Sequence, residues 1–182
     1  MMGSTGMQFV EYSAAHCHAV RKNRVVDKGM LLQFLEIERE VGIPKRFRGM
    51  SVAKACTESG YNPRARGDCY GKNGKCLAVG IIQLHPCYDV KRTDPIASMR
   101  FYLEKIKRDA SSKKLRRHCP GVKTKADRWQ TAWVRVNRGP NIRTAGMLVR
   151  KNGKPIRRCS GVPHGLRKLR YWNRSINKKD KK

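Results

Sequence analysis

The sequence predicts a mainly α-helical single domain with a small extended, hairpin-containing region. A chain of 182 residues with 39% hydrophobic content has the length of one domain and enough apolar side chains to bury a core. Apolar residues recur at helical spacing in several separate segments. Two Asn-Gly pairs, at 73–74 and 152–153, are typical of tight reversals between short extended segments.

The first helix is predicted to follow an N-terminal arm. Residues 1–28 show no clean periodicity, and Cys17 is expected to tie this arm down through a disulfide bond. Between residues 28 and 41 the apolar side chains recur at positions i, i+4, i+7 and i+11. This spacing predicts an amphipathic helix that ends at Gly42 and Pro44.

A carboxylate is predicted at the end of the second helix. Val52, Ala53 and Cys56 recur at helical spacing, and the last turn of this buried helix carries Glu58. Gly60 suits the left-handed position that ends such a helix. The negative end of the helix dipole and the apolar neighbours disfavour a charged carboxylate, so we expect the pKa of Glu58 to be raised, as a general acid requires. The alternative is a solvent-exposed glutamate that only ends a helix.

The next segment, residues 69–76, is predicted to be an inserted loop. Cys69 and Cys76 flank the Asn73-Gly74 turn and are expected to form a disulfide bond. Such a loop either shapes access to a neighbouring groove or is a surface insertion that is cross-linked because it has no core of its own.

One helix and one loop are predicted between residues 94 and 124. Asp94-Pro95 supplies an N-cap and a first-turn proline for a helix that extends to about residue 108. Residues 110–124 are rich in Lys, Arg and Ser, and we expect them to form a solvated loop. Cys119 in this loop is a candidate to pair with Cys159.

Two helices and a hairpin are predicted after residue 124. Thr124 and Asp127 resemble a capping box at the start of a helix that ends before Gly139-Pro140. Residues 147–158 are expected to form a β-hairpin around the second Asn-Gly pair. The last helix is expected at about residues 163–176, where apolar and basic side chains alternate with helical period.

Three blocks of the sequence resemble one protein family. Glu58-Ser59-Gly60-Tyr61-Asn62-Pro63 followed by Gly80-Ile81-Ile82-Gln83 resembles the soluble lytic transglycosylase and goose-type lysozyme superfamily. The segment 133–140 resembles a third block of that family. It has Asn137 in place, but Val136 stands where the family usually has a tyrosine that reaches towards the acid. The resemblance implies a lysozyme-like catalytic domain over residues 29–176, with the loop 69–76 and the hairpin 147–158 as insertions.

The resemblance also implies a reaction and a set of site residues. The substrate is bacterial peptidoglycan, cleaved at the β-1,4 bond between N-acetylmuramic acid and N-acetylglucosamine, and Glu58 corresponds to the catalytic acid. The residues expected to contact the substrate are Ser59, Tyr61, Gly80, Gln83 and Asn137. Because Val136 has no hydroxyl, either another group such as Tyr61 supplies one beside Glu58 or the acid lies in a drier pocket.

The reaction type has two possible outcomes. A hydrolase with two carboxylates needs the second one about 5 Å away as nucleophile, or roughly 6.5 to 9.5 Å away to hold a water molecule. Goose-type lysozymes that use helper aspartates carry them near the glycine-glutamine block, at places where this chain has Gly74 and His85. Asp68 is the possible second carboxylate, although it and Asp89 are displaced from those places. We expect a lytic transglycosylase that forms 1,6-anhydromuramic ends, with a hydrolytic lysozyme as the alternative.

The charge predicts an anionic partner. The chain has 42 Lys and Arg against 13 Asp and Glu, a formal net charge of +29 that is spread along its length. Nucleic acid, an anionic membrane surface and anionic cell-wall or envelope polymers all fit such a field. No nucleic-acid-binding motif is recognisable, so we expect a monomer that binds peptidoglycan strands and envelope polymers, with a charged, disordered tail at 177–182. The alternative is a basic protein that binds the wall or nucleic acid without turnover.

The cysteines predict an exported protein. Seven cysteines without a Cys-x-x-Cys pair favour an oxidising compartment, periplasmic or extracellular, and their odd number leaves at least one thiol free or paired with another molecule. The sequence has no apolar run long enough for a membrane span, and the N-terminus lacks the apolar core of a signal peptide, so we expect that the signal has been removed. His16 and His18 do not share a helical face and have no second ligand pair nearby, so no metal and no cofactor are expected.

Overall fold

The architecture is mainly helical, with two small antiparallel hairpins. The computed structural model describes residues 4–20, 24–69, 76–86, 88–119, 121–136, 148–151, 154–157 and 165–179. In these residues two separate two-stranded sheets accompany the helices, so the predicted mainly α fold class with a small hairpin region is confirmed.

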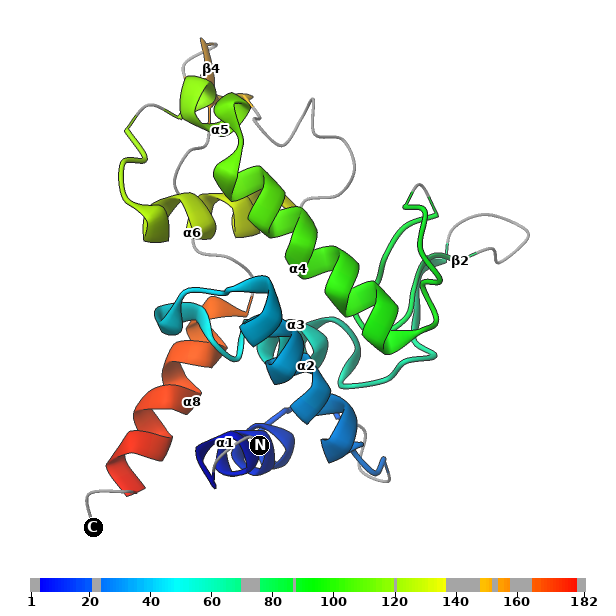
Figure 1. The fold of residues 1–182 in the computed structure, drawn as a ribbon. Helices are drawn as coiled ribbons and strands as arrows, with labels where there is room; N and C mark the ends of the chain where they lie inside the picture. Colours follow the sequence, from blue (N-terminus) through cyan, green and yellow to red (C-terminus); the bar gives the residue numbers. More distant parts are fainter. Residues whose placement is uncertain are drawn as a thin grey trace.

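The elements follow one another along the chain in a simple order. The helices are α1 (Ser4–Ala15), α2 (Lys28–Val41), the 3-10 helix η1 (Lys45–Phe47), α3 (Met50–Ser59), α4 (Pro95–Ser111), α5 (Lys113–His118), α6 (Lys125–Val136) and α8 (Leu166–Lys179). The strands are β1 (Arg66–Cys69), β2 (Cys76–Val79), β3 (Leu148–Lys151) and β4 (Lys154–Arg157). In Figure 1, α4 runs through the middle of the molecule with α6 and α2 packed against it, while α8 packs against α1 and α3.

The helices nearest the acid begin and end as the sequence predicts. Asp27 caps α2, because its side chain accepts a hydrogen bond from the Met30 backbone N–H at 2.9 Å, and Gly42 ends the helix in the left-handed region with φ 81°. Gly60 ends α3 in the same way with φ 57°. Asp94 caps α4 by accepting from two backbone N–H groups of its first turn.

The N-terminal segment contains a helix that its weak periodicity did not predict. Phe9 and Val10 of α1 belong to the hydrophobic core, and the ring of Phe9 lies edge-on to Trp172 of α8 with ring centroids 6.1 Å apart. Cys17 forms a disulfide bond with Cys56 of α3, which confirms its expected role in tying down this segment. The expected arm is therefore part of the packed structure.

The prediction of a solvated loop over residues 110–124 is wrong at its centre. Ser112 caps α5 by accepting a hydrogen bond from the Leu115 backbone N–H at 3.0 Å. Leu115 is buried, so one apolar side chain anchors a helix in a segment of otherwise polar composition. Cys119 is disulfide-bonded, while its expected partner Cys159 lies outside the described residues.

Both expected hairpins are present in the backbone. In the second one, β3 and β4 pair from Leu148 opposite Arg157 to Lys151 opposite Lys154, which confirms the predicted hairpin. In the first one, the antiparallel register of β1 and β2 places Cys69 opposite Cys76. The side chains of both cysteines and residues 70–75 lie outside the described part of the chain, so their disulfide bond stays a prediction.

The last helix ends three residues later than expected. Leu166, Leu169 and Trp172 of α8 are buried, in agreement with the predicted apolar face. The helix continues to Lys179, so the first residues of the segment expected to be a disordered tail are helical. Residues 180–182 lie outside the described part.

The start of α3 is held by a buried carboxyl of α2. Gly49 occupies the N-cap position and offers no side chain. Glu38 takes that place: its side chain accepts hydrogen bonds from the backbone N–H groups of Gly49 (2.6 Å) and Ser51 (2.7 Å), and from the Ser51 hydroxyl (2.6 Å). Glu38 is only 1% exposed, and this burial raises its pKa to about 7 against the opposing effect of the hydrogen bonds.

The pH dependence of stability should reveal Glu38. Its pKa rises from the ordinary value of 4.5 to about 7 on folding, so the native state binds more protons than the unfolded state between these two values. The stabilising contribution is present below the lower value and is lost as the pH rises to the upper one, by up to about 3 kcal/mol. We expect Glu38→Gln to remove this part of the slope in urea unfolding measured from pH 4 to 8. An unchanged slope in the variant would contradict the assignment.

Candidate active site

Glu58 lies in the last turn of α3 and is paired with a lysine on the same helix. Its Oε1 is 2.6 Å from the Nζ of Lys54, one turn earlier. The side chain of Glu58 is 22% exposed, whereas that of Lys54 is 6% exposed. Glu58 is therefore neither a fully solvated helix end nor an isolated buried acid, and its carboxylate lies between a buried cation and the surface.

Lys54 and Tyr102 are two described residues near the acid. Burial lowers the pKa of Lys54, and the neighbouring Glu58 carboxylate partly offsets this effect. The Lys54 Nζ lies 5.4 Å from the ring centroid of Tyr102 on α4. Tyr102 is buried, and its pKa is raised by that burial and by the negative charge of Glu58. The acid is thus paired with a buried ammonium, and a buried tyrosine ring lies beside that ammonium.

Neither Lys54 nor Tyr102 was among the site residues predicted from the sequence. The available signal for Lys54 was a lysine inside an apolar helix, one turn before the acid. The signal for Tyr102 was a hydroxyl-bearing side chain within the apolar stripe of α4, which the periodicity alone assigns to the core.

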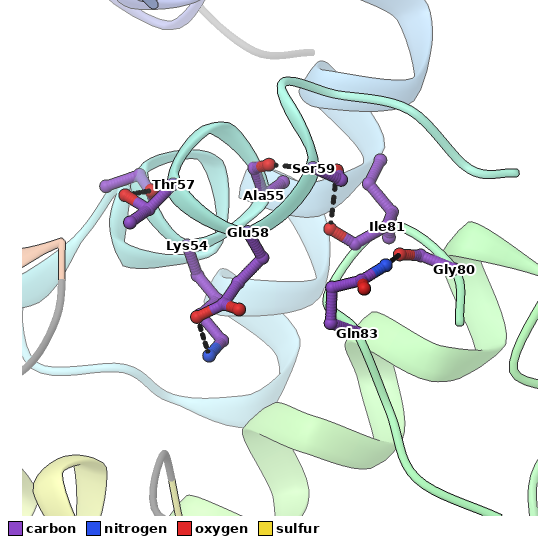
Figure 2. Close-up of polar contacts among 9 residues, drawn as sticks. Lys54, Ala55, Thr57, Glu58, Ser59, Gly80, Ile81 and Gln83 are labelled. Carbon is purple, nitrogen blue, oxygen red and sulfur yellow. Dashed lines mark hydrogen bonds and ion pairs between the residues drawn. The ribbon is translucent and has the colours of Figure 1, made fainter. Parts of the chain in front are cut away.

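Ser59 joins the acid-bearing helix to the turn that contains Gln83. Its hydroxyl donates to the Ile81 carbonyl at 2.7 Å and also lies 3.1 Å from the Ala55 carbonyl (Figure 2). The same oxygen accepts a hydrogen bond from the Asn62 backbone N–H. The hydroxyl is engaged within the protein, so the structure gives Ser59 a tethering position.

Gly80 and Gln83 shape the turn itself. Gly80 has φ 84°, and a Cβ there would lie 1.9 Å from the Arg92 carbonyl oxygen, so no larger residue fits. Gln83 donates from its Nε2 to the Gly80 carbonyl at 2.8 Å, and its Oε1 lies against Gly67. Its side chain is partly exposed. In this arrangement the side-chain amide of Gln83 closes the turn through its bond to the Gly80 carbonyl (Figure 2).

The other expected site residues lie apart from this cluster or outside the description. Tyr61 is buried, its hydroxyl donates to the Ser13 carbonyl at 3.4 Å, and burial raises its pKa. That hydroxyl is directed towards α1, whereas the Tyr102 ring lies 5.4 Å from the Nζ of Lys54, the partner of Glu58. Val136 is buried in α6. Asn137 and the side chain of Asp68 lie outside the described residues.

A cleft of about 610 Å³ lies beyond the loop that follows α3. It is lined by Tyr61, Pro63 and Arg64 of that loop and by residues at the starts of α2 and α4. Glu58 does not line this cleft. Among the described residues, no group of three or more His, Cys, Asp or Glu is placed to hold a metal ion, and no described helix has the length and apolarity to span a membrane.

Comparisons with protein-family models, curated proteins and solved structures give no match to this chain. The function of the site must therefore be inferred from its own residues. These are Glu58, a carboxylate paired with Lys54 at a helix end, and the Gly80–Gln83 turn, which Ser59 joins to that helix.

Removing the Ser59 hydroxyl should loosen the turn that carries Gln83. We expect Ser59→Ala to lower the free energy of unfolding by about 1–2 kcal/mol, because the hydrogen bond to the Ile81 carbonyl is lost. Amide exchange should also become faster at Gln83 and Leu84, whose N–H groups bond within this turn. Thr57→Ala is the matched control, since the Thr57 hydroxyl bonds only within α3. Equal effects of the two variants on exchange at Gln83 would refute the tethering role.

Proposed function

We propose that the protein cleaves the glycan strands of bacterial peptidoglycan as a lytic transglycosylase, with Glu58 as the acid and then the base. One observation carries the proposal: the turn Gly80–Gln83 is bonded through Ser59 to the helix end that carries Glu58. The two sequence blocks that resemble the lytic transglycosylase and goose-type lysozyme superfamily are therefore neighbours in space. Tyr102 supports the proposal further, because its ring lies beside the Lys54 partner of the acid and so supplies a tyrosine near Glu58, although Val136 has no hydroxyl.

The reaction follows from a single carboxyl and a nucleophile within the substrate. Glu58 gives its proton to O4 of N-acetylglucosamine, the glycosidic oxygen, while the bond between this oxygen and C1 of N-acetylmuramic acid breaks and positive charge develops on the muramic ring. The 6-hydroxyl of the same muramic residue then attacks C1. Glu58, now a carboxylate, takes the hydroxyl proton. An intramolecular nucleophile needs no bound water, because it is already held at high effective concentration.

Hydrolysis is the alternative fate of the same bond. It needs a second carboxyl that activates or replaces the water. Asp68 of β1 is the candidate from the sequence, and its backbone lies in the hairpin that precedes the Gly80–Gln83 turn. The two outcomes differ in their products: hydrolysis leaves a reducing muramic end, and transglycosylation leaves a 1,6-anhydro end.

The outer face of α8 is the best candidate for binding anionic envelope polymers. Arg167, Arg170, Tyr171 and Arg174 recur at helical spacing and are all exposed, while α8 contains no Asp or Glu. Elsewhere, some exposed acids are paired with bases, as Glu40 is with Arg100. The buried face of α8 fixes the orientation of this cationic face, and the exposed positive charge favours the binding of polyanions. The same face would serve the second candidate function, which is a basic protein that binds the wall or nucleic acid without turnover.

Export of the protein is part of the same proposal. The Cys17–Cys56 bond and the disulfide-bonded Cys119 are compatible with an oxidising compartment, periplasmic or extracellular. Peptidoglycan lies in or beyond that compartment.

The decisive test is Glu58→Gln. The amide keeps the volume of the side chain but has no proton to transfer, so we expect the clearing of purified walls to fall by at least about a thousandfold. The thermal midpoint should fall, because the amide leaves the buried Lys54 ammonium without its carboxylate partner. Wall clearing is therefore measured below the melting temperature of the variant. Retention of activity within about tenfold of wild type would remove Glu58 from its proposed role.

The products separate the two reaction types. Mass spectrometry of digested peptidoglycan is expected to show 1,6-anhydromuramic ends. Reducing muramic ends, together with an Asp68→Asn variant as inactive as Glu58→Gln, would establish the hydrolytic alternative. Wall or DNA binding without any cleavage would favour the second candidate function.

Charge on α8 should control association with whole walls more than catalysis. We expect Arg167→Gln, Arg170→Gln and Arg174→Gln together to weaken binding to intact sacculi by at least about tenfold at low salt, and to reduce its salt dependence. Cleavage of short soluble glycans should be unaffected. A control variant with Lys113, Arg116 and Arg117 of α5 changed to Gln removes the same charge from exposed positions away from α8 (Figure 1). Equal losses in both variants would show that the charge acts diffusely.

A further inference from the structure

Lys54 is buried, although a lysine can form an ion pair with a glutamate at the protein surface without being buried. Its side chain is 6% exposed and its Nζ lies 2.6 Å from the Glu58 carboxylate. By contrast, the Lys28–Glu11 pair at 3.4 Å has side chains that are 52% and 56% exposed. Removing an ammonium from water opposes folding by several kcal/mol unless its partner compensates. A buried lysine one turn from the proposed catalytic acid, and paired with it, therefore calls for a chemical role.

The pair also poses a problem for an acid catalyst. A general acid must carry a proton when the leaving oxygen arrives, yet the partner of an ammonium is a carboxylate. The proton that the pair holds in this arrangement is on the Lys54 Nζ.

Exclusion of water changes where that proton resides. Transfer from Nζ to the carboxyl converts two opposite charges into two neutral groups, and neutral groups lose far less than ions when water leaves. A glycan strand that covers the partly exposed Glu58 would remove water from this side of the pair. The buried position of Lys54 already removes it from the other side.

We propose that Lys54 is a positioning residue that stores the proton which Glu58 delivers to the glycosidic oxygen. This inference rests on the proposed function. When substrate covers the site, an Nζ–H bond breaks and a carboxyl O–H bond forms, which leaves a neutral amine beside a neutral acid. Glu58 then protonates the leaving oxygen, accepts the proton of the muramic 6-hydroxyl, and returns it to Lys54. No proton is exchanged with solvent in the complete cycle.

The other ionisable groups that the structure describes around α3 are either neutral or bonded elsewhere. On α4, burial and the Glu58 charge raise the pKa of Tyr102, so its phenol stays neutral at working pH. On α8, Lys168 donates to the Cys56 Sγ at 3.1 Å. On α2, Glu38 is bonded at the opposite end of α3. On α1, Glu11 is exposed and paired with Lys28. Burial lowers the pKa of Lys54 itself, which makes its proton easier to give.

Two substitutions separate proton storage from simple charge pairing. Lys54→Arg keeps the positive charge but holds its proton at every accessible pH. Lys54→Met keeps the length and apolar stem without a charge. Lys28→Met is the matched control, because it removes one exposed lysine from a pair with a glutamate. The measurement is kcat/KM on short soluble glycans from pH 4 to 10, with thermal melting of each variant to verify folding.

The expected pH profiles differ in their alkaline limbs. Wild type should keep its activity to pH 8 or above, because the pair retains one proton until Lys54 loses it. In Lys54→Met the limb should move down by about 2 or more pH units, since the acid must then take its proton from solvent. Lys54→Arg should be at least about a hundredfold less active at pH 8, because its guanidinium fixes the carboxylate form. Lys28→Met should follow wild type.

Three outcomes would overturn the inference, and they differ from failure of the proposed function. If Lys54→Arg restored the wild-type profile, charge alone would explain Lys54. If the limb of Lys54→Met coincided with that of wild type, Lys54 would hold no catalytic proton. If both variants melted below the assay temperature, 13C NMR of the Glu58 carboxyl in wild type would decide, with its signal assigned by comparison with Glu58→Gln. Binding of a chito-oligosaccharide should move the carboxyl signal to the protonated position. An unmoved signal would refute the exchange. A wild type that cleaves no glycan at any pH would instead refute the proposed function.

Discussion

The placement of α3 is the constraint on which the rest of the candidate site depends. A ten-residue helix carries few hydrogen bonds of its own, so its position is set by what holds its two ends. At the first turn, Glu38 accepts three hydrogen bonds from Gly49 and Ser51. At the last turn, the Ser59 hydroxyl reaches the Ile81 carbonyl. Between these ends the helix is buried, with the Cys17–Cys56 bond on one of its faces. Glu58 thus extends from a helix whose direction and rotation are both fixed.

Local signals in the sequence predicted most of the fold. Gly42, Gly60 and Asp94 act on backbone groups within a few residues, and each of them begins or ends a helix at the predicted place. The same reasoning failed for α1 and α5, which have short or weakly periodic apolar patterns. Helix α1 is stabilised by contacts with distant elements, such as that between Phe9 and Trp172, and such contacts leave little trace in a local window.

The candidate site was predictable only in part, for a related reason. Motif spacing indicated Glu58 and the Gly80–Gln83 turn, and the structure joins them through Ser59. Spacing could not show that the Ser59 hydroxyl is engaged internally, or that Tyr61 is directed towards Ser13. Spacing also could not show that the ring of Tyr102, more than forty residues after Glu58 in the sequence, lies beside the Lys54 partner of that acid. A polar side chain within a motif has several possible partners, and tertiary packing selects among them.

The bond between Cys17 and Cys56 also limits the unfolded chain. It links residues 39 positions apart, and in the chain-entropy view a closed loop of that size removes about 4 kcal/mol of conformational freedom from the unfolded ensemble. This gain acts against the self-repulsion of a chain with a net charge of +29. In a reducing medium the same sequence would hold its N-terminal helix against α3 by packing alone. The redox state of the surroundings therefore sets how firmly the helix that carries Glu58 is covered.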